Sequence, residues 1–153
     1  MARVATRGPW LAVALVAAAV VMPFPGGAHA DEGVVLLVNA TNPTSTVTAS
    51  EARRAFTGGT KQWPHGAVVQ VGVTATESAE LRYVASLSDM TPRELLSRIQ
   101  EQVFKVEMRK PVVLRSAGEC IGLARANPGA ICAATRPATL PPEVKVLVVR
   151  GSR

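Results

Sequence analysis

The sequence contains few of the residues from which most catalytic and metal sites are built. Its 153 residues include two histidines and two cysteines, and aromatic residues make up 4%. His29 falls in an N-terminal stretch with the features of a cleaved leader, so His65, in a Pro/Gly turn, is the one imidazole left for a folded domain. A zinc site and a Ser-His-Asp or Cys-His catalytic group are therefore not expected.

The acidic residues do not form an obvious catalytic pair either. Most of them fall on predicted helices at solvent-facing positions, and no two stand out as a general acid and its base. The sequence also has no Gly-rich phosphate loop and no metal-binding motif. We therefore expect a protein that is not an enzyme and that carries no metal and no cofactor.

The excess of positive charge is mild. Lys and Arg number 17 against 11 Asp and Glu, for a net charge of +6. Beyond the leader, the basic residues are scattered and form only two doublets, Arg53-Arg54 and Arg109-Lys110. Because no basic stripe is interleaved with aromatic residues, we expect no nucleic-acid partner. The modest positive field would favour anionic partners, but scattered basic residues are more typical of an ordinary solvated surface.

The first 30 residues have the pattern of a signal peptide. Arg3 and Arg7 precede an apolar run from Trp10 to Met22, and Ala28-His-Ala30 fits a cleavage site. The alternative is an uncleaved membrane anchor. However, the run of about 13 apolar residues is short of the roughly 20 that span a bilayer. We expect an exported, periplasmic or secreted protein whose single domain is residues 31–153.

The two cysteines leave two interpretations open. In an oxidising compartment, Cys120 and Cys132 would form a disulfide that closes a short loop between a helix and the next strand. Alternatively, they are two small buried apolar side chains. Their spacing is not that of a metal site.

Apolar runs bounded by turn residues predict strands separated by helices. An uninterrupted apolar run such as Val34–Val38 suits a strand that is covered on both faces. Alternating strands and helices that end in a strand pair predict a layered α/β domain. The predicted strands are 34–38, 68–73, 112–114, 130–134 and 144–149.

Capping residues mark where the helices begin. Thr48 with Glu51 fits a capping box for a short helix that ends before Gly58-Gly59. A second helix is predicted at 77–87, and Ser116 is predicted to cap the last helix. A third helix begins with Thr91 as its cap and Pro92 in first position, and its predicted apolar face consists of Leu95, Leu96, Ile99, Val103 and Phe104.

Several motifs follow one another in an order that is informative as a whole. They are a hydrophobic strand ending in Asn39, then Asn42-Pro43, a helix ending Glu51-Ala-Arg-Arg-Ala-Phe56, Gly58 or Gly59, Lys61-Gln-Trp63-Pro64-His-Gly66, and later Asn127-Pro-Gly-Ala-Ile131. This order resembles the phosphate-binding-protein-like periplasmic solute-binding proteins. The resemblance covers most of the chain after residue 33. It implies an α/β periplasmic-binding-protein-like lobe, with a mixed sheet flanked by helices, in an abbreviated single-lobe form.

The resemblance also implies where a ligand would bind. In that family, an anion is held by hydroxyls and backbone N–H groups at helix N-termini. The matching candidates are Thr44 and Ser45 in the first loop, and Thr74, Thr76 and Ser78 after the second predicted strand. A two-lobed protein traps its ligand by hinge closure. A single lobe has no second jaw, so we expect it to bind weakly, to use a partner or to form a homodimer.

The second of these loops departs from the family pattern. Its glycines are missing, so the backbone cannot approach an anion as closely. Glu77 and Glu80 fall in the first helical turn, where they satisfy the helix dipole and repel a phosphate.

The sequence therefore supports two main hypotheses. The first is an exported, non-catalytic module that binds a small oxyanion such as phosphate and docks on a membrane transporter or sensor, like the substrate-binding component of a phosphate ABC transporter. The alternative is a periplasmic protein-interaction or sensory module that keeps the lobe fold but has lost small-ligand binding. An exported hydrolase is the least favoured hypothesis.

Overall fold

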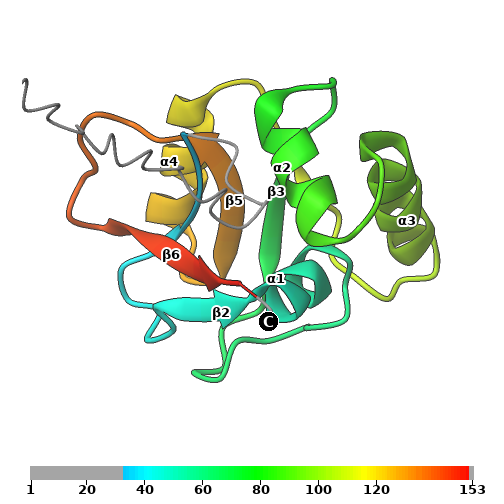
Figure 1. Ribbon diagram of the computed structural model, residues 1–153. Coiled ribbons are helices and arrows are strands. Elements are labelled where there is room, and N and C mark those ends of the chain that lie inside the picture. Colours follow the sequence, from blue (N-terminus) through cyan, green and yellow to red (C-terminus); the bar gives the residue numbers. More distant parts are fainter. Residues whose placement is uncertain (1–32, 152–153) are drawn as a thin grey trace, which may run out of the picture.

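The computed structural model describes residues 33–151, so the predicted signal peptide lies outside the described residues. Six strands form one mixed sheet in the order β2-β6-β1-β5-β3-β4, and helices cover both of its faces (Figure 1). This arrangement confirms the predicted α/β fold with a mixed sheet flanked by helices. The elements are β1 (Val34–Asn39), β2 (Thr46–Thr48), α1 (Ala49–Phe56), β3 (Gln70–Thr74), α2 (Ala79–Leu87), α3 (Pro92–Phe104), β4 (Val112–Leu114), α4 (Ala117–Ala126), β5 (Ala130–Thr135) and β6 (Val144–Arg150).

Strand β1 lies inside the sheet and is antiparallel to both of its neighbours, β5 and β6. Strand β3 is parallel to β5 on one side and to β4 on the other. The carboxyl ends of β3, β4 and β5 therefore meet at one edge of the sheet, and the carboxyl end of β1 lies at the opposite edge. This polarity decides which loops can share a site.

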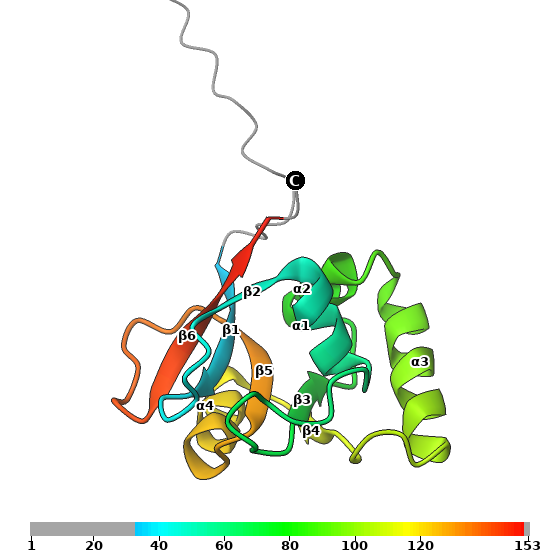
Figure 2. The same ribbon diagram turned by 90° about the horizontal axis from the view of Figure 1, so that it is seen from below.

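The alternating side chains of β1 divide the core into two layers. Val34, Leu36 and Val38 pack in the core beneath α1, α2 and α3, whereas Val35 and Leu37 pack beneath α4. All five are buried, as expected for an apolar strand that is covered on both faces. Figures 1 and 2 show α1 and α2 on one side of the sheet and α4 on the other.

The capping residues set the helix boundaries as predicted. Thr48 with Glu51 forms the capping box of α1, and Thr91 with Glu94 forms that of α3, where Pro92 takes the first position. The predicted helix at 77–87 begins two residues later, because Ser78 is its N-cap. Strand β2 was not predicted. Its three residues form a strand because they pair with β6, where Thr46 lies opposite Val148, far along the sequence.

One predicted core residue is exposed. Leu95 and Ile99 of α3 are buried, but Phe104 is 89% exposed, so its placement on the apolar face was wrong. Phe104 follows Leu95 by two and a half turns, at about 3.6 residues per turn, and so lies on the opposite side of the helix.

The Asn-Pro-Gly turn before β5 is tied to the Trp-Pro turn before β3. The carbonyl of Gly129 accepts a hydrogen bond of 3.0 Å from the indole N–H of Trp63 and one of 2.9 Å from the backbone N–H of Gln70. Trp63 is buried. A β-carbon on Gly129 would lie 1.8 Å from the carbonyl oxygen of Val68, so only glycine fits at this position.

A disulfide joins the second face of the sheet to its helix. Cys120 of α4 and Cys132 of β5 are bonded, with their Cα atoms 5.9 Å apart, and both are fully buried. The bond closes a short loop, since the two residues are 12 apart in sequence. It therefore fixes α4 against the strand that it precedes.

We predict that Gly129→Ala lowers the free energy of unfolding by about 2–3 kcal/mol, because the backbone of two turns must separate to admit the methyl group. Gly122→Ala is the matched control, since a β-carbon there meets no atom within 4 Å and the residue lies inside α4. It should raise stability by about 0.5–1 kcal/mol through helix propensity. Urea denaturation measures both; equal effects would contradict the close packing at Gly129.

We predict that replacing both cysteines by alanine lowers the free energy of unfolding by about 2–4 kcal/mol, because an unfolded chain without the bond gains conformational entropy. The free energy of unfolding of the double variant should equal that of the reduced parent to within about 1 kcal/mol. A difference of that size is expected because Cys and Ala pack differently. A parent protein whose stability does not respond to reductant would contradict this assignment.

Candidate functional site

The helices that follow the neighbouring strands β3 and β4 pack on opposite faces of the sheet. The chain leaves β3 toward α2, which packs in one core layer, and it leaves β4 toward α4, which packs in the other. In open α/β sheets, the point where adjacent connections diverge in this way leaves a crevice outside the carboxyl ends of the strands. Ligands commonly bind in such a crevice.

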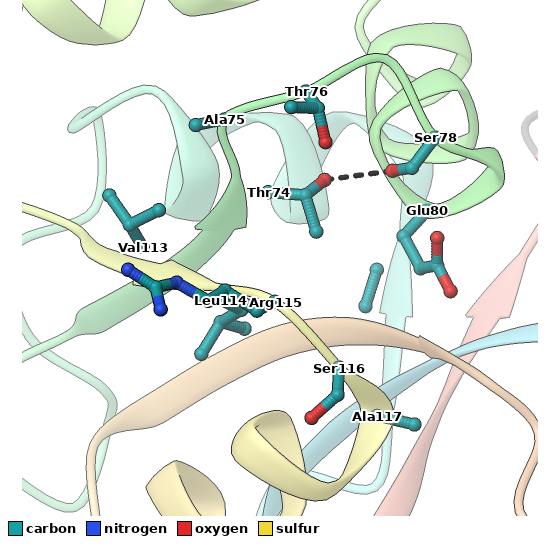
Figure 3. Close-up of a pocket in the computed structure, with 11 residues that line it drawn as sticks. Thr74, Ala75, Thr76, Ser78, Glu80, Val113, Leu114, Arg115, Ser116 and Ala117 are labelled. Atoms are coloured by element: carbon teal, nitrogen blue, oxygen red, sulfur yellow. Dashed lines mark hydrogen bonds between the residues drawn. The ribbon is translucent and has the colours of Figure 1, made fainter.

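A cavity of about 420 Å³ occupies this point. Figure 3 shows residues from the ends of β3 and β4 and from the starts of α2 and α4 around it. The lining residues are Thr74, Ala75, Thr76, Ser78, Glu80, Val113, Leu114, Arg115, Ser116, Ala117 and Ala133. Two helix N-termini and four hydroxyl side chains therefore border one open cavity.

On the α2 side, two hydroxyls are already hydrogen-bonded. Ser78 is the N-cap, and its Oγ accepts a 3.1 Å bond from the backbone N–H of Leu81. The same Oγ lies 2.8 Å from Oγ1 of Thr74 (Figure 3). Either oxygen can be the donor of that bond, so one hydroxyl proton of the pair is not used within it. Thr76, in the exposed loop between them, carries another.

The α4 side has the same construction. Ser116 is the N-cap, and its Oγ accepts a 3.2 Å bond from the backbone N–H of Glu119. Glu119 in turn accepts a 2.7 Å bond from the backbone N–H of Arg115. The Arg115 side chain is exposed on the rim of the cavity and runs toward Val113 rather than toward Glu80 (Figure 3).

Glu80 places a carboxylate in the wall of the cavity. Its Oε1 accepts hydrogen bonds from the hydroxyl of Thr135, at 2.8 Å, and from the backbone N–H of Thr135, at 3.3 Å. Burial alone would raise the pKa of Glu80. Hydrogen bonds from its own backbone N–H, from Thr135 and from Ser78 outweigh burial and lower the pKa below its usual value. Glu80 is therefore an anion of the protein itself that already uses donors at the start of α2.

The structure brings together three of the five predicted ligand-binding residues. Thr74, Thr76 and Ser78 all line the cavity. Thr44 and Ser45 follow β1, so they lie at the opposite edge of the sheet, and neither lines this cavity. There, the backbone N–H of Thr44 donates to Asn42 at 2.9 Å, and Oγ of Ser45 accepts from Nζ of Lys145 at 3.1 Å.

Asn39 and Asn42 hold that opposite edge together. The side-chain amide of Asn39 donates to the carbonyls of Ala124 and Arg125, at 2.8 and 3.2 Å, at the C-terminal end of α4. Asn42 is fully buried, and its Oδ1 closes the turn to Thr44. The contacts of both asparagines thus shape the loop after β1.

Two residues of the cavity, Arg115 and Ser116, were not predicted as part of a site. The sequence indicated a strand at 112–114 with Ser116 as a cap behind it, which is the same pattern as Thr74 and Ser78. What the sequence did not give is the parallel pairing of β3 with β4, on which their proximity depends.

Other kinds of site have little support in the part of the chain that is described. Across residues 33–151, no group of three or more His, Cys, Asp or Glu side chains could hold a metal ion. His65 is exposed in its turn. None of the helices between residues 33 and 151 is both long and apolar enough to cross a membrane.

Comparisons with known proteins give a relationship of fold. The sequence matches no known protein family, and it has no significant match among curated proteins. Among solved structures, the chain is similar to an ABC-type phosphate transport receptor from Vibrio cholerae, with a TM-score of 0.54 and 15% sequence identity. The match covers 78% of this chain and 46% of the receptor chain, so it spans about half the length of the receptor. The protein therefore shares the fold of part of this phosphate transport receptor.

Proposed function

We propose that this protein is an exported, non-catalytic solute-binding module that takes a small polar ligand of the oxyanion class in the cavity between β3 and β4. The observation that carries the proposal is the convergence of two capped helix N-termini on one cavity at the carboxyl ends of parallel strands. Docking on a membrane transporter or sensor is part of the same proposal, and the phosphate receptor of similar fold supports it.

The chemistry of the cavity suits a ligand rich in hydrogen-bond acceptors. The hydroxyl protons of Thr76 and Ser116 are available, and the second proton of the Thr74–Ser78 pair is shared with Glu80. The positive ends of the α2 and α4 dipoles favour negative charge at the same place. Arg115 adds a cation on the rim of the cavity.

The same geometry limits the affinity. The carboxylate of Glu80 repels a second anion, and it already accepts bonds from Thr135. Since the loop from Thr74 to Ser78 has no glycine, its backbone cannot approach a ligand closely. We therefore expect Kd values in the millimolar range, to the order of magnitude, for simple oxyanions.

A second candidate function follows from Glu80. If this internal carboxylate takes the place of a ligand, the cavity is closed to free anions and the protein acts as a periplasmic interaction or sensory module. The hydrogen bonds that Thr135 donates to Glu80 favour this candidate specifically.

We predict that a saturable rise in melting temperature accompanies the addition of one oxyanion among phosphate, sulfate and molybdate, because a ligand that binds only the folded state stabilises it by RT ln(1 + [L]/Kd). Thr76→Ala should reduce that rise, each variant being compared with its own ligand-free melting temperature. Thr44→Ala is the matched control, because Thr44 lies at the opposite edge of the sheet. Loss of the rise in Thr44→Ala alone would move the site to the first loop. If no oxyanion raises the melting temperature, the oxyanion-binding proposal is contradicted and the interaction module is the remaining candidate.

We predict that Glu80→Gln raises oxyanion affinity about five- to tenfold, since it removes a like charge whose repulsion is on the order of 1 kcal/mol in a site open to water. Glu77→Gln is the control, because Glu77 is exposed before the N-cap Ser78 and its carboxylate lies 3.7 Å from the guanidinium of Arg82. Calorimetric titration measures both variants. An equal gain in the two variants would indicate a general effect of net charge, and no gain would contradict the assigned role of Glu80.

We also predict that Glu80 contributes to the decrease in the free energy of unfolding at acid pH. Because its pKa is lowered in the folded state, its contribution is fully present above about pH 4.5, its usual pKa, and is lost as the pH falls through the lowered value. Glu80→Gln should lose less stability than the parent between pH 5 and pH 3, measured by urea denaturation. Parallel curves for parent and variant would argue against the hydrogen bonds to Thr135.

A further inference from the structure

The corner of the molecule after α3 presents apolar side chains to solvent. Phe104 and Val106 are 89% and 87% exposed, the highest values among the large apolar residues of the described chain. They flank Lys105, and the segment continues through Glu107 and Met108 to Arg109 and Lys110. Figure 2 shows α3 and the loop that follows it at one side of the molecule, away from β6 and β2.

The backbone holds Val106 in this position at a cost in stability. The N–H of Val106 donates to the carbonyl of Val103, and the N–H of Glu107 donates to that of Gln102, which is the Schellman pattern at the end of a helix. Its left-handed position is normally glycine, yet here Val106 has a φ of +58°. A β-branched residue is a rare and strained occupant of this conformation. The fold therefore keeps an apolar side chain in water where glycine would be more stable.

Two basic residues follow the two apolar side chains in the sequence, and Lys105 between the apolar residues is paired with Glu101. The exposed side chains of Arg109 and Lys110 form no ion pair among residues 33–151. The single acidic residue of the segment, Glu107, is paired with Lys61 at 3.0 Å. The corner thus combines exposed apolar groups with uncompensated cations.

We propose that residues 104–110 dock this protein on the surface of an anionic lipid bilayer. Phe104 and Val106 enter the boundary between headgroups and acyl chains, and Arg109 and Lys110 contact the negative headgroups. Binding of this kind depends jointly on the inserted apolar area and on attraction to anionic lipid. An apolar patch that served a protein interface would not require the free cations beside it. The segment is separate from the cavity between β3 and β4, so the proposal does not depend on the proposed solute.

The test uses the protein in the form recovered after export, with its first residue established by mass spectrometry. The probes are vesicles of phosphatidylcholine alone and vesicles that also contain phosphatidylglycerol. We expect cosedimentation with the anionic vesicles only, weakened by salt. Phe104→Ser with Val106→Ser should abolish it, whereas Val148→Ser, at an exposed valine of β6, should leave it unchanged.

The charge requirement has its own matched control. Arg109→Ala with Lys110→Ala should lower the partition coefficient by about five- to twentyfold, the effect expected of two basic residues near an anionic surface. Arg53→Ala with Arg54→Ala removes the other basic doublet, on α1, and should change it little. Phe104→Trp should shift its fluorescence to the blue on anionic vesicles, since Trp63 is buried and unaffected. No partition of the parent, equal losses for the two doublets, or no blue shift would each overturn the proposal.

Val106→Gly separates a docking role from a structural one. It should raise the melting temperature by about 3–6 °C, because glycine adopts the left-handed conformation without strain. It should also weaken vesicle binding, because an inserted side chain is lost. A variant that is more stable and binds vesicles as well as the parent would show that Val106 does not contact the bilayer.

Discussion

The placement of β1 inside the sheet, antiparallel to both neighbours and buried on both faces, is the constraint on which the rest of the structure depends. Its alternating valines and leucines need a covering layer on each side, and α1 and α2 supply one layer while α4 supplies the other. That division sends the chain after β3 and the chain after β4 to opposite faces. The crevice at the ends of these two strands is a consequence of the division, and so is the position of every hydroxyl that lines it.

Local signals in the sequence predicted most of the fold. Thr48, Thr91 and Ser116 cap helices because a hydroxyl can satisfy a free backbone N–H within one turn, which needs no knowledge of the tertiary structure. The exposure of Phe104 was available locally, since the residue lies two and a half turns after Leu95 and so on the opposite side of α3. Strand β2 was missed because its partner strand lies about a hundred residues away in the sequence. The site was predicted in part for the same reason. Thr74, Thr76 and Ser78 form one local loop, whereas Arg115 and Ser116 join them only through the parallel pairing of β3 and β4.

The cavity contains opposing electrostatic features. Two helix dipoles and the hydroxyl protons of Thr76 and Ser116 favour an anion, and the carboxylate of Glu80 opposes it from within the same wall. The hydrogen bonds from Thr135 keep that carboxylate ionised and in place. Glu80 is thus the residue that decides between a weak oxyanion site and a cavity occupied by the protein's own acid. The surface at residues 104–110 is independent of this choice, since it lies at the end of α3 and its chemistry is apolar and basic.

The most direct test of the proposed solute site is a two-dimensional amide NMR titration of the purified protein with phosphate, sulfate and molybdate. The account predicts that one of these oxyanions shifts the amide signals of Thr76, Glu80 and Ser116 together along a single saturation curve, while the signals of Thr44 and Ser45 stay in place. Shifts confined to the loop after β1, or uniform shifts that follow ionic strength without saturation, would contradict the assignment of the cavity between β3 and β4 as the binding site.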